Sequence, residues 1–157
     1  MGSPDLPIVH WPSSHILLVS VVRLGLAALL GGVIGLQRQR VHSTAGLRTH
    51  MLVSVGSAFF VLAAIEAGAT ATDVSRVIQG LVAGVGFLGA GAILKIGDRE
   101  EVHGLTTAAS IWLIAAVGTG AGLGHLWLPV LGAAFGWIIL GPIGRLEKRP
   151  QPPPPQT

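Results

Sequence analysis

Two charged residues of the chain, Arg23 and Glu66, fall inside long apolar runs of the sequence. An ionisable side chain at membrane depth is costly, and it commonly marks a functional position or pairs with another charge. Both residues fall toward the same predicted outer side of the membrane, so we expect an intramembrane charge pair between them. Two alternatives stay open: Arg23 could reach the lipid headgroups without a partner, or the two charges could serve transport.

Carboxylates are the groups that a magnesium site would need, because Mg²⁺ prefers hard oxygen ligands in octahedral geometry. None of the acids falls near the middle of an apolar run, and the densest group is typical of a solvated loop; the acids are Asp5, Glu66, Asp73, Asp98, Glu100, Glu101 and Glu147. The histidines His42, His50 and His103 fit no metal-ligand spacing. The sequence therefore predicts no carboxylate or histidine metal site at the membrane midplane.

Enzymatic chemistry has no support in the sequence. The chain has no cysteine, which excludes a thiolate nucleophile and a zinc–thiolate site. The glycine-rich stretch 80–95 lacks the Lys–Ser/Thr ending of a nucleotide-binding loop, and no nucleophile–base pair is evident. We expect no enzymatic activity and no cofactor, with Mg²⁺ entering only as an ion that the protein transports or senses.

The composition places these residues in a membrane protein. Half of the chain is hydrophobic and 11% is charged, against about 25% charged residues in ordinary soluble domains. Five apolar runs are long enough to cross a bilayer: residues 16–36, 51–69, 77–96, 105–123 and 126–144. We expect an all-α, polytopic transmembrane helical bundle over residues 16–144, with a polar leader, 1–15, and a basic, proline-rich cytoplasmic tail, 145–157.

Basic residues predict the orientation of the bundle, because they favour the cytoplasmic side of a membrane. They gather around the ends of the first and third runs and in the tail: Arg38, Arg40, Arg48, Lys95, Arg99, Arg145, Lys148 and Arg149, whereas the second loop has only Arg76, set beside Asp73. This alternation predicts an N-terminus outside and a C-terminus inside. It also accounts for the net charge of +3 without a nucleic-acid partner, and leaves the lipid bilayer as the expected surroundings.

Glycines recur four residues apart in four of the runs. The pairs are Gly31 and Gly35, Gly80 and Gly84, Gly118 and Gly122, and Gly132 and Gly136. Small residues at this spacing let membrane helices approach closely. The third run, GLVAGVGFLGAGAILK, has more glycine and alanine than one packing face needs, which favours a central helix or a helix that lines a path. Because five short helices enclose little space alone, we also expect a homo-oligomer.

The first and third runs are related by an offset of 58 residues. Leu30–Gly31 falls on Leu88–Gly89, Gly46–Leu47 falls on Gly104–Leu105, and Thr49 falls on Thr107. Each half reads as a glycine-rich helix, a charged loop, a GL-x-T corner and a returning helix. The pattern predicts a parallel repeat of two-helix units about an axis along the membrane normal, unless glycine-rich helices align by composition alone.

Four segments resemble the successive motifs of the MgtC/SapB membrane proteins: RLGLAALLGGVIGLQRQ, AGLRTHMLVSVGSAFF, DVSRVIQGLVAGVGFLGAGAILK and VHGLTTAASIW. The resemblance covers roughly residues 23–124. It implies a multi-pass protein of the bacterial inner membrane, tied to growth at low magnesium and, in some pathogens, to survival in macrophages. It also implies regulation of partner membrane proteins.

The motif match assigns a set of candidate functional positions: Arg38, Gly46, Arg48, Thr49, His50, Asp73, Arg76, Gly84, Gly86, Gly89, Gly91, Thr106, Thr107 and Ser110. Two features depart from the family pattern. Gln37 and Gln39 stand where the family usually has glutamates, which weakens a cation site at that corner. Many members also carry a further cytoplasmic domain, whose functions cannot be transferred to this chain.

Local hypotheses follow for the polar residues near the helix ends. Asp73 or Ser75 could cap the third helix. Thr106 and Ser110 could bond back to the fourth helix or line a polar entrance. At the cytoplasmic mouth, Arg38, Arg48 and Thr107 would cluster and could hold an anionic group or an acidic loop of a partner.

Two mechanisms remain for the whole protein. It could be a regulator that docks on another membrane protein through small-residue helix faces. Alternatively, it could be a small oligomeric ion or solute transporter with the third helix lining the path. The missing midplane carboxylates favour the regulator.

Overall fold

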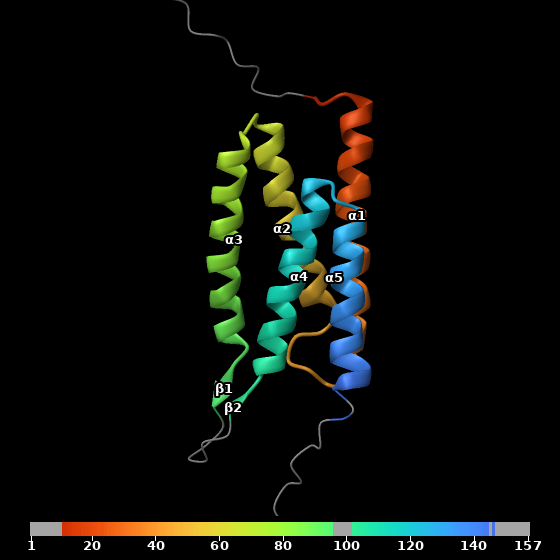
Figure 1. Cartoon of the computed structure of the whole chain (residues 1–157), viewed down its shortest axis with the longest axis vertical. Helices are drawn as coiled ribbons and strands as arrows, with labels where there is room; N and C mark the ends of the chain where they lie inside the picture. The colour runs from red at the N-terminus through yellow and green to blue at the C-terminus, as the bar shows by residue number, and fades with distance from the viewer. Residues whose placement is uncertain (1–10, 96–101, 145, 147–157) are drawn as a thin grey trace, which may run out of the picture.

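The computed structural model describes residues 11–95, 102–144 and 146. Helices dominate this part of the chain, and one short antiparallel hairpin joins the third helix to the fourth (Figure 1). The elements are α1 (Ser14–Arg40), α2 (Leu47–Glu66), α3 (Ala71–Gly91), β1 (Leu94–Lys95), β2 (Val102–His103), α4 (Leu105–Leu123), α5 (Trp127–Ile138) and a π-helical continuation of α5 (Ile139–Ile143). The predicted helical bundle is therefore confirmed.

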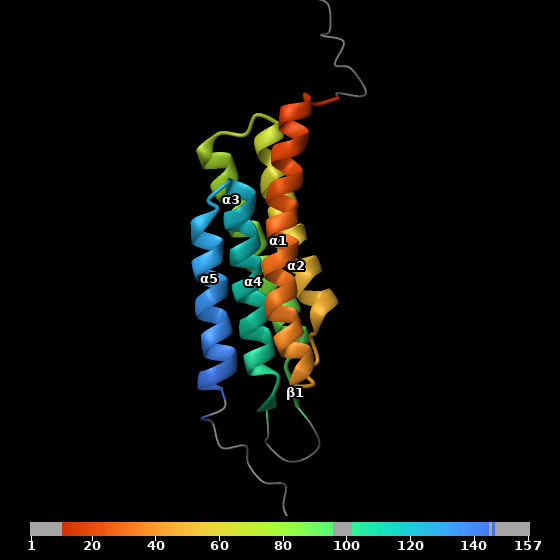
Figure 2. The same ribbon diagram turned by 90° about the vertical axis from the view of Figure 1, so that its right-hand side faces the viewer.

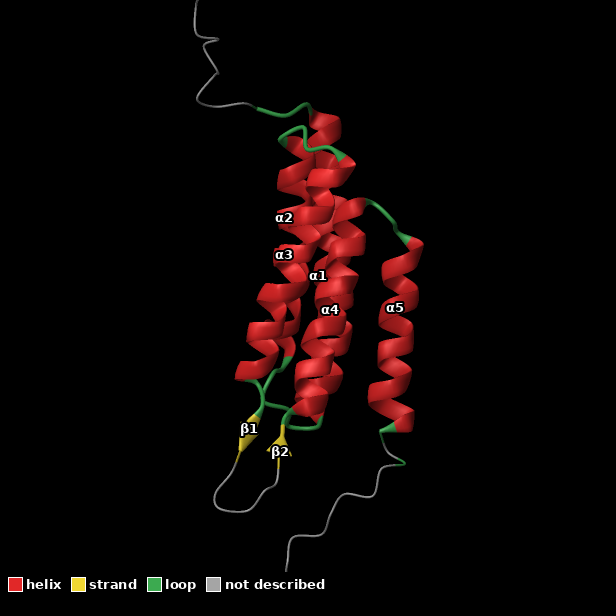
Figure 3. Ribbon diagram, turned by 60° about the vertical axis from the view of Figure 1, so that its left-hand side comes forward, coloured by secondary structure: helices red, strands yellow, loops and turns green. Residues whose placement is uncertain are grey.

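Successive helices run in alternating directions along one long axis (Figures 1 and 2). Within the described residues, four helices, α1 to α4, are long and apolar enough to cross a membrane, and α5 with its continuation is a shorter apolar helix. One end of the bundle holds the last turn of α1, the first turns of α2 and α4, and the two strands (Figure 3). We call it the Arg38 end.

The helix boundaries differ from the apolar runs at the polar ends. α1 continues to Arg40, four residues beyond the predicted end, and α2 begins at Leu47, four residues before the predicted start. Polar residues such as Gln and Arg are good helix formers, so helices extend past the point where hydropathy falls. α3 begins at Ala71 and ends at Gly91, where 77–96 was predicted, and residues 94–95 form β1 instead of helix.

The start of α3 shows how its first turn is capped. Thr70 is the N-cap, and its hydroxyl oxygen accepts from the backbone N–H of Asp73 at 3.3 Å. The Asp73 carboxylate accepts in return from the backbone N–H of Thr70 at 3.1 Å. This reciprocal pair is a capping box. Of the two predicted capping residues, Asp73 takes part in the cap, three residues after the N-cap itself, whereas Ser75 does not and donates to the carbonyl of Thr72.

Glycine pairs clamp α2 between two neighbours. A Cβ added at Gly31 of α1 would stand 2.8 Å from the carbonyl oxygen of His50. One added at Gly35 would stand 2.7 Å from Cα of Leu47. On the other side of α2, a Cβ at Gly122 of α4 would stand 2.6 Å from the carbonyl oxygen of Ala58, and one at Gly118 would collide with the carbonyl of Ser54. These approaches are open only to glycine, as expected for small-residue packing.

The central helix of the described chain is α4, and the expectation of a central α3 is wrong. In the 18-residue apolar stretch of α4 that could cross a membrane, half of the residues are buried, whereas 17% are buried in the corresponding stretch of α3. The buried residues of α3 are few and lie on one side: Val74, Val85 and Gly89. α3 therefore covers the edge of the bundle and leaves most of its circumference without protein neighbours.

The contacts between helices support the predicted repeat. α2 and α4 begin 58 residues apart, at Leu47 and Leu105, each directly after an N-cap glycine. Gly31 packs on the backbone of His50, and Gly89 packs on Ala108, so both partners of this contact are shifted by the same offset. Each half is thus a hairpin whose first helix rests on the start of its second.

Candidate functional site

A cluster of hydrogen-bonded polar side chains occupies the Arg38 end. Arg38, in the last turn of α1, is 9% exposed. Its Nη2 donates to Ser43 Oγ at 3.1 Å and to Thr107 Oγ1 at 3.3 Å, and the two hydroxyl oxygens are 2.9 Å apart. Residues from α1, the following loop and α4 therefore meet at one point, which we call the Arg38 corner.

His50 links α2 to α4 one turn deeper in the bundle. Its ring is fully buried, with Nδ1 2.9 Å from the carbonyl oxygen of Gly46 and Nε2 3.0 Å from Ser110 Oγ. A carbonyl oxygen only accepts, so Nδ1 carries a hydrogen, and Nε2 of the neutral ring accepts from Ser110. Ser110 Oγ is also 2.8 Å from the carbonyl oxygen of Thr107, and its single hydrogen serves one of the two acceptors at a time.

The Ser110–His50 distance resembles that between a nucleophile and its base. Sequence analysis did not identify this pair, because the two residues are 60 positions apart in the chain. Ser110 is 2% exposed and His50 has no exposed surface, so neither side chain reaches a substrate. The contact holds α2 against α4.

Arg23 has a backbone partner in place of the predicted charge pair. Its Nη1 donates to the carbonyl oxygen of Gly122 at 3.1 Å, at the end of α4, where unpaired carbonyls carry partial negative charge. Gly124 follows with a left-handed φ of 87°, and a Cβ there would meet Arg23 Nη2 at 2.7 Å. Within the described residues Arg23 forms no ion pair with Glu66, which is exposed.

The two glutamines beside Arg38 each serve a local structural role. Gln37 Nε2 donates to the carbonyl oxygen of Trp137 at 3.0 Å, one turn before Pro142 in the π-helical segment. Proline lacks the N–H that would serve a carbonyl of the preceding turn, so the Gln37 amide replaces it. Gln39 Oε1 accepts from the backbone N–H of Leu47 at 3.4 Å, beside the first turn of α2.

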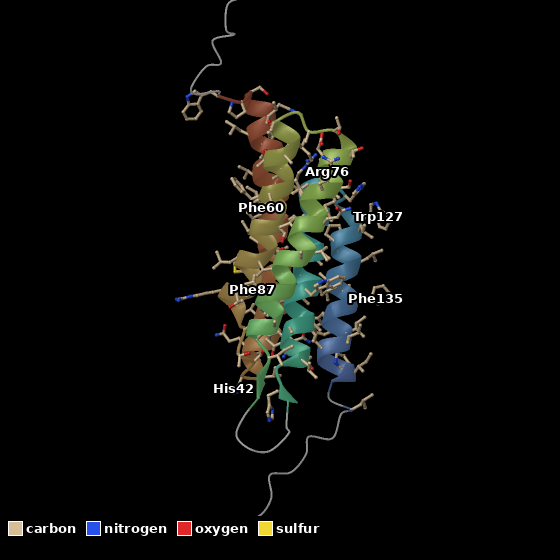
Figure 4. All side chains as sticks on the ribbon, turned by 90° about the vertical axis from the view of Figure 1, so that its left-hand side faces the viewer. His42, Phe60, Arg76, Phe87, Trp127 and Phe135 are labelled. Carbon is tan, nitrogen blue, oxygen red and sulfur yellow. The ribbon has the colours of Figure 1, made fainter. Side chains whose placement is uncertain are left out.

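The structure separates the remaining candidate residues into several places. Arg48, Thr49 and Thr106 lie at the Arg38 end but are exposed, so Arg48 does not join the corner with Arg38 and Thr107. Asp73 and Arg76 lie in the first turns of α3 at the opposite end, as Figure 4 shows for Arg76. The acids Asp98, Glu100 and Glu101 lie outside the described residues, as does the predicted tail, 145–157, except for Leu146. Ser43 was missed, because a serine in a short loop carries no distinguishing signal.

A second feature is an apolar groove between α2 and α3. It has a volume of about 670 Å³. Its walls are made by Leu52, Val53, Gly56, Ser57, Phe60, Val77, Gly80, Leu81, Gly84, Val85 and Leu88. Phe60 and Phe87 project outward from α2 and α3 in Figure 4, with 59% and 82% of their surfaces exposed. A Cβ at Gly56, Gly80 or Gly84 would meet nothing within 4 Å.

The groove and the Arg38 corner differ in what they can bind. The groove is lined by hydrocarbon with a single polar side chain, Ser57, so it suits an apolar partner. The Arg38 corner carries a buried cation and hydroxyl groups. Among the described residues, no group of three or more histidine, aspartate or glutamate side chains could hold a metal ion.

A bundle of helices that are long and apolar enough to cross a membrane, with a buried polar cluster at one end, is the architecture of a membrane protein. The chain belongs to the MgtC family, whose sequence pattern it matches over residues 24–149. This membership confirms the resemblance seen in the motifs.

Three relatives show how the similarity is distributed. The chain is 47% identical over 137 residues to "Protein SrpB" of Synechococcus elongatus, covering 80% of this chain and 75% of the relative. It is 39% identical over 127 residues to "Putative magnesium transporter YhiD" of Escherichia coli, covering 76% of this chain and 58% of the relative. It is 50% identical over 99 residues to "Protein MgtC" of Brucella abortus, covering 62% and 40%. No solved structure matches the chain.

Proposed function

We propose that the protein is a non-enzymatic protein of the bacterial inner membrane that takes part in magnesium homeostasis and supports growth at low Mg²⁺. It acts as a regulator, by docking a transmembrane helix of a partner membrane protein into the α2–α3 groove. The magnesium role is supported by membership of the MgtC family and by the name of the relative YhiD. In this proposal the Arg38 end faces the cytoplasm, in keeping with its basic residues.

One observation carries the docking proposal, and it concerns the four glycine pairs. Three of them pack inside the chain: Gly31/Gly35 and Gly118/Gly122 on α2, and Gly132/Gly136 against side chains of α4. The fourth pair, Gly80/Gly84, faces the groove with nothing within 4 Å. Because such pairs serve close helix approach, the fourth pair supports a helix that comes from outside the chain.

Ser57 adds a polar contact point on the other wall of this groove. It is 3% exposed and lines the groove, and its hydroxyl group has no hydrogen-bond partner in the part of the chain that the structure describes. Hydroxyl groups commonly bond across membrane helix interfaces. A partner helix seated on Gly80 and Gly84 would bring a carbonyl or polar side chain within reach of this group.

The second candidate function is a small oligomeric transporter in which α3 lines the path. The name of the relative YhiD favours it, and so does the glycine face of α3, where an added Cβ at Gly80, Gly84 or Gly86 would meet nothing within 4 Å. An apolar groove is a poor path for a hydrated divalent ion, because Mg²⁺ dehydrates reluctantly and requires oxygen ligands. This argument places the regulator first.

The test is Mg²⁺ flux into proteoliposomes that contain only the purified protein, compared with growth of cells at low Mg²⁺. Gly84→Leu fills the groove, and the structure has room for the side chain. Gly86→Leu is the matched control, since Gly86 also has nothing within 4 Å and does not line the groove. Circular dichroism establishes that each variant is folded. Cross-linking from one side of the membrane establishes that it is inserted in the same orientation as the wild type.

For the regulator we expect no flux from the wild type, and loss of growth at low Mg²⁺ with Gly84→Leu but not with Gly86→Leu. Flux in the wild type that Gly84→Leu abolishes would replace the regulator with the transporter. Normal growth with both variants would show that the groove is not required for the function.

A further inference from the structure

The guanidinium of Arg38 has more hydrogen-bond donors than the chain provides acceptors for. A guanidinium has five N–H donors and no acceptor. Nη2 serves Ser43 and Thr107, whereas Nε is buried without an acceptor. Nη1 has no acceptor either in the described residues. Because buried polar groups are almost always paired, the corner lacks an acceptor.

The two hydroxyl groups add one more unpaired donor. Ser43 Oγ and Thr107 Oγ1 each accept from Arg38 and lie 2.9 Å from each other. One hydroxyl hydrogen spans the pair, and the other has no acceptor in the portion of the chain that is described. The missing group therefore accepts hydrogen bonds and does not need to donate any.

The helix ends at the corner are also positive. Thr107 belongs to the first turn of α4, which starts after Gly104 with no side-chain cap and no acidic residue. α2 likewise starts after Gly46 with no acidic residue in its first turn, and only a neutral amide oxygen, that of Gln39, accepts from its first N–H group. Unpaired N–H groups at such starts carry partial positive charge and bind anions.

No counter-charge offsets these groups within the described residues, where Arg38 forms no ion pair. Gln37 and Gln39 beside it are neutral, and both amides are directed to other partners, Trp137 and Leu47. The C-terminal end of α1 supplies only a partial negative charge. A buried arginine usually has a negative partner, so the partner is expected from outside the described part.

We propose that the Arg38 corner binds a phosphate oxyanion, which comes either from a lipid headgroup or from a soluble phosphate compound. Phosphate fits because it offers several acceptor oxygens and no obligatory donor, and arginine with helix N-termini is a recurrent phosphate-binding combination. Donors from α1, the Ser43 loop and the start of α4 converge on the corner. Binding would join α1 to α4 at this end, independently of the α2–α3 groove.

The experiment uses the full-length protein, delipidated in dodecyl maltoside, which contains no phosphate. Its thermal unfolding is followed during titration with inorganic phosphate, with short-chain phosphatidylglycerol, or with chloride at matched ionic strength. A ligand of the folded state raises Tm in a saturable way. The variants are Arg38→Gln, Thr107→Val, which keeps the shape but removes the hydroxyl group, and Arg40→Gln, a control at an exposed neighbouring arginine.

We expect a saturable rise in Tm with the wild type and Arg40→Gln. The apparent affinity should fall by about tenfold or more in Arg38→Gln, since it loses a charged partner, and should also fall in Thr107→Val, which decides the question if Arg38→Gln does not fold. A response to inorganic phosphate identifies a soluble source, and a response to the phospholipid alone identifies a headgroup.

Three results would overturn the proposal. One is the absence of a saturable response to either phosphate source. Another is an equal response in Arg38→Gln, which would indicate unspecific electrostatics. The last is evidence for a carboxylate as the natural partner of Arg38. Such evidence would be a response to phosphate only after Asp98, Glu100 and Glu101 are replaced by amides, or a response only to an acidic peptide.

Discussion

A methyl group added at Gly122 probes how closely α2 and α4 approach each other. In Gly122→Ala the new Cβ would stand 2.6 Å from the carbonyl oxygen of Ala58 and 2.9 Å from its Cα. Ordinary van der Waals contact begins at 3.4 Å, so the oxygen lies about 0.8 Å too close. The obstructing atoms belong to a backbone, which cannot rotate away, and the two helices must therefore separate.

The cost of this separation can be worked out from the same contacts. Overpacking in a close-packed interior costs about 1–3 kcal/mol. A gap of about 0.5–1 Å along the rest of the seam also forfeits about a quarter to a half of the dispersion energy there. Alanine has a higher helix propensity than glycine by about 1 kcal/mol, which offsets part of the loss. We expect Gly122→Ala to lower the free energy of unfolding by about 2 kcal/mol.

The same substitution at Gly84 supplies the matched comparison. There the new Cβ would meet nothing within 4 Å, so only the helix propensity changes, and we expect a gain of up to about 1 kcal/mol. Both variants are unfolded in mixed micelles of dodecyl maltoside and sodium dodecyl sulfate. Helix content is followed by circular dichroism.

Two outcomes would refute this reasoning. A neutral Gly122→Ala would mean that α2 and α4 do not cross as closely as described. An equal loss in Gly84→Ala would mean that the glycine face of α3 is packed within the folded chain, and the docking proposal would lose its main support.

Further predictions concern the polar contacts between helices, each measured by the same unfolding assay. Arg23→Leu should lower stability by about 1–2 kcal/mol, because it removes a cation from the C-terminal end of α4; the charge swap Arg23→Glu with Glu66→Arg should be no more stable than Arg23→Glu, and a rescue would establish the charge pair instead. Gln37→Glu should cost about 1–3 kcal/mol, because a carboxylate then faces the Trp137 carbonyl oxygen; the loss should shrink at acid pH, where a protonated carboxyl group donates, and an equal loss at every pH would contradict this account. His50→Leu should cost about 1–3 kcal/mol, because it removes the two hydrogen bonds of the imidazole ring, to the Gly46 carbonyl and to Ser110, and an unchanged stability would show that these bonds are not made.

Much of the fold could be predicted because bilayer length and hydropathy are strong constraints. The range of α4, 105–123, was predicted without error, since Gly104 and Gly124 bound an uninterrupted apolar run. The ends of α1 and α2 were missed because residues such as Gln37 and Arg48 continue a helix that hydropathy has already ended.

The site was harder to predict than the fold. The family motif selected Arg38, His50, Thr107 and Ser110. The structure joins them in two adjoining clusters through contacts between different helices, and the residue spacing within one helix cannot predict such contacts. The choice of Thr106 with Ser110 followed the four-residue spacing of one helix. The structure buries Thr107 instead, because its contacts come from α1 and the Ser43 loop.

The hydrogen bonds of the Arg38 corner also bear on the order in which the protein is made. A ribosome delivers α1 and α2 first, and their glycine seam involves only those two helices. Arg38 and His50, however, receive Thr107 and Ser110 only after a further 69 and 60 residues have been added. During that interval the side chains of Arg38 and His50 lack these contacts with α4. Arrival of α4 is therefore the step of biosynthesis that closes this end of the protein.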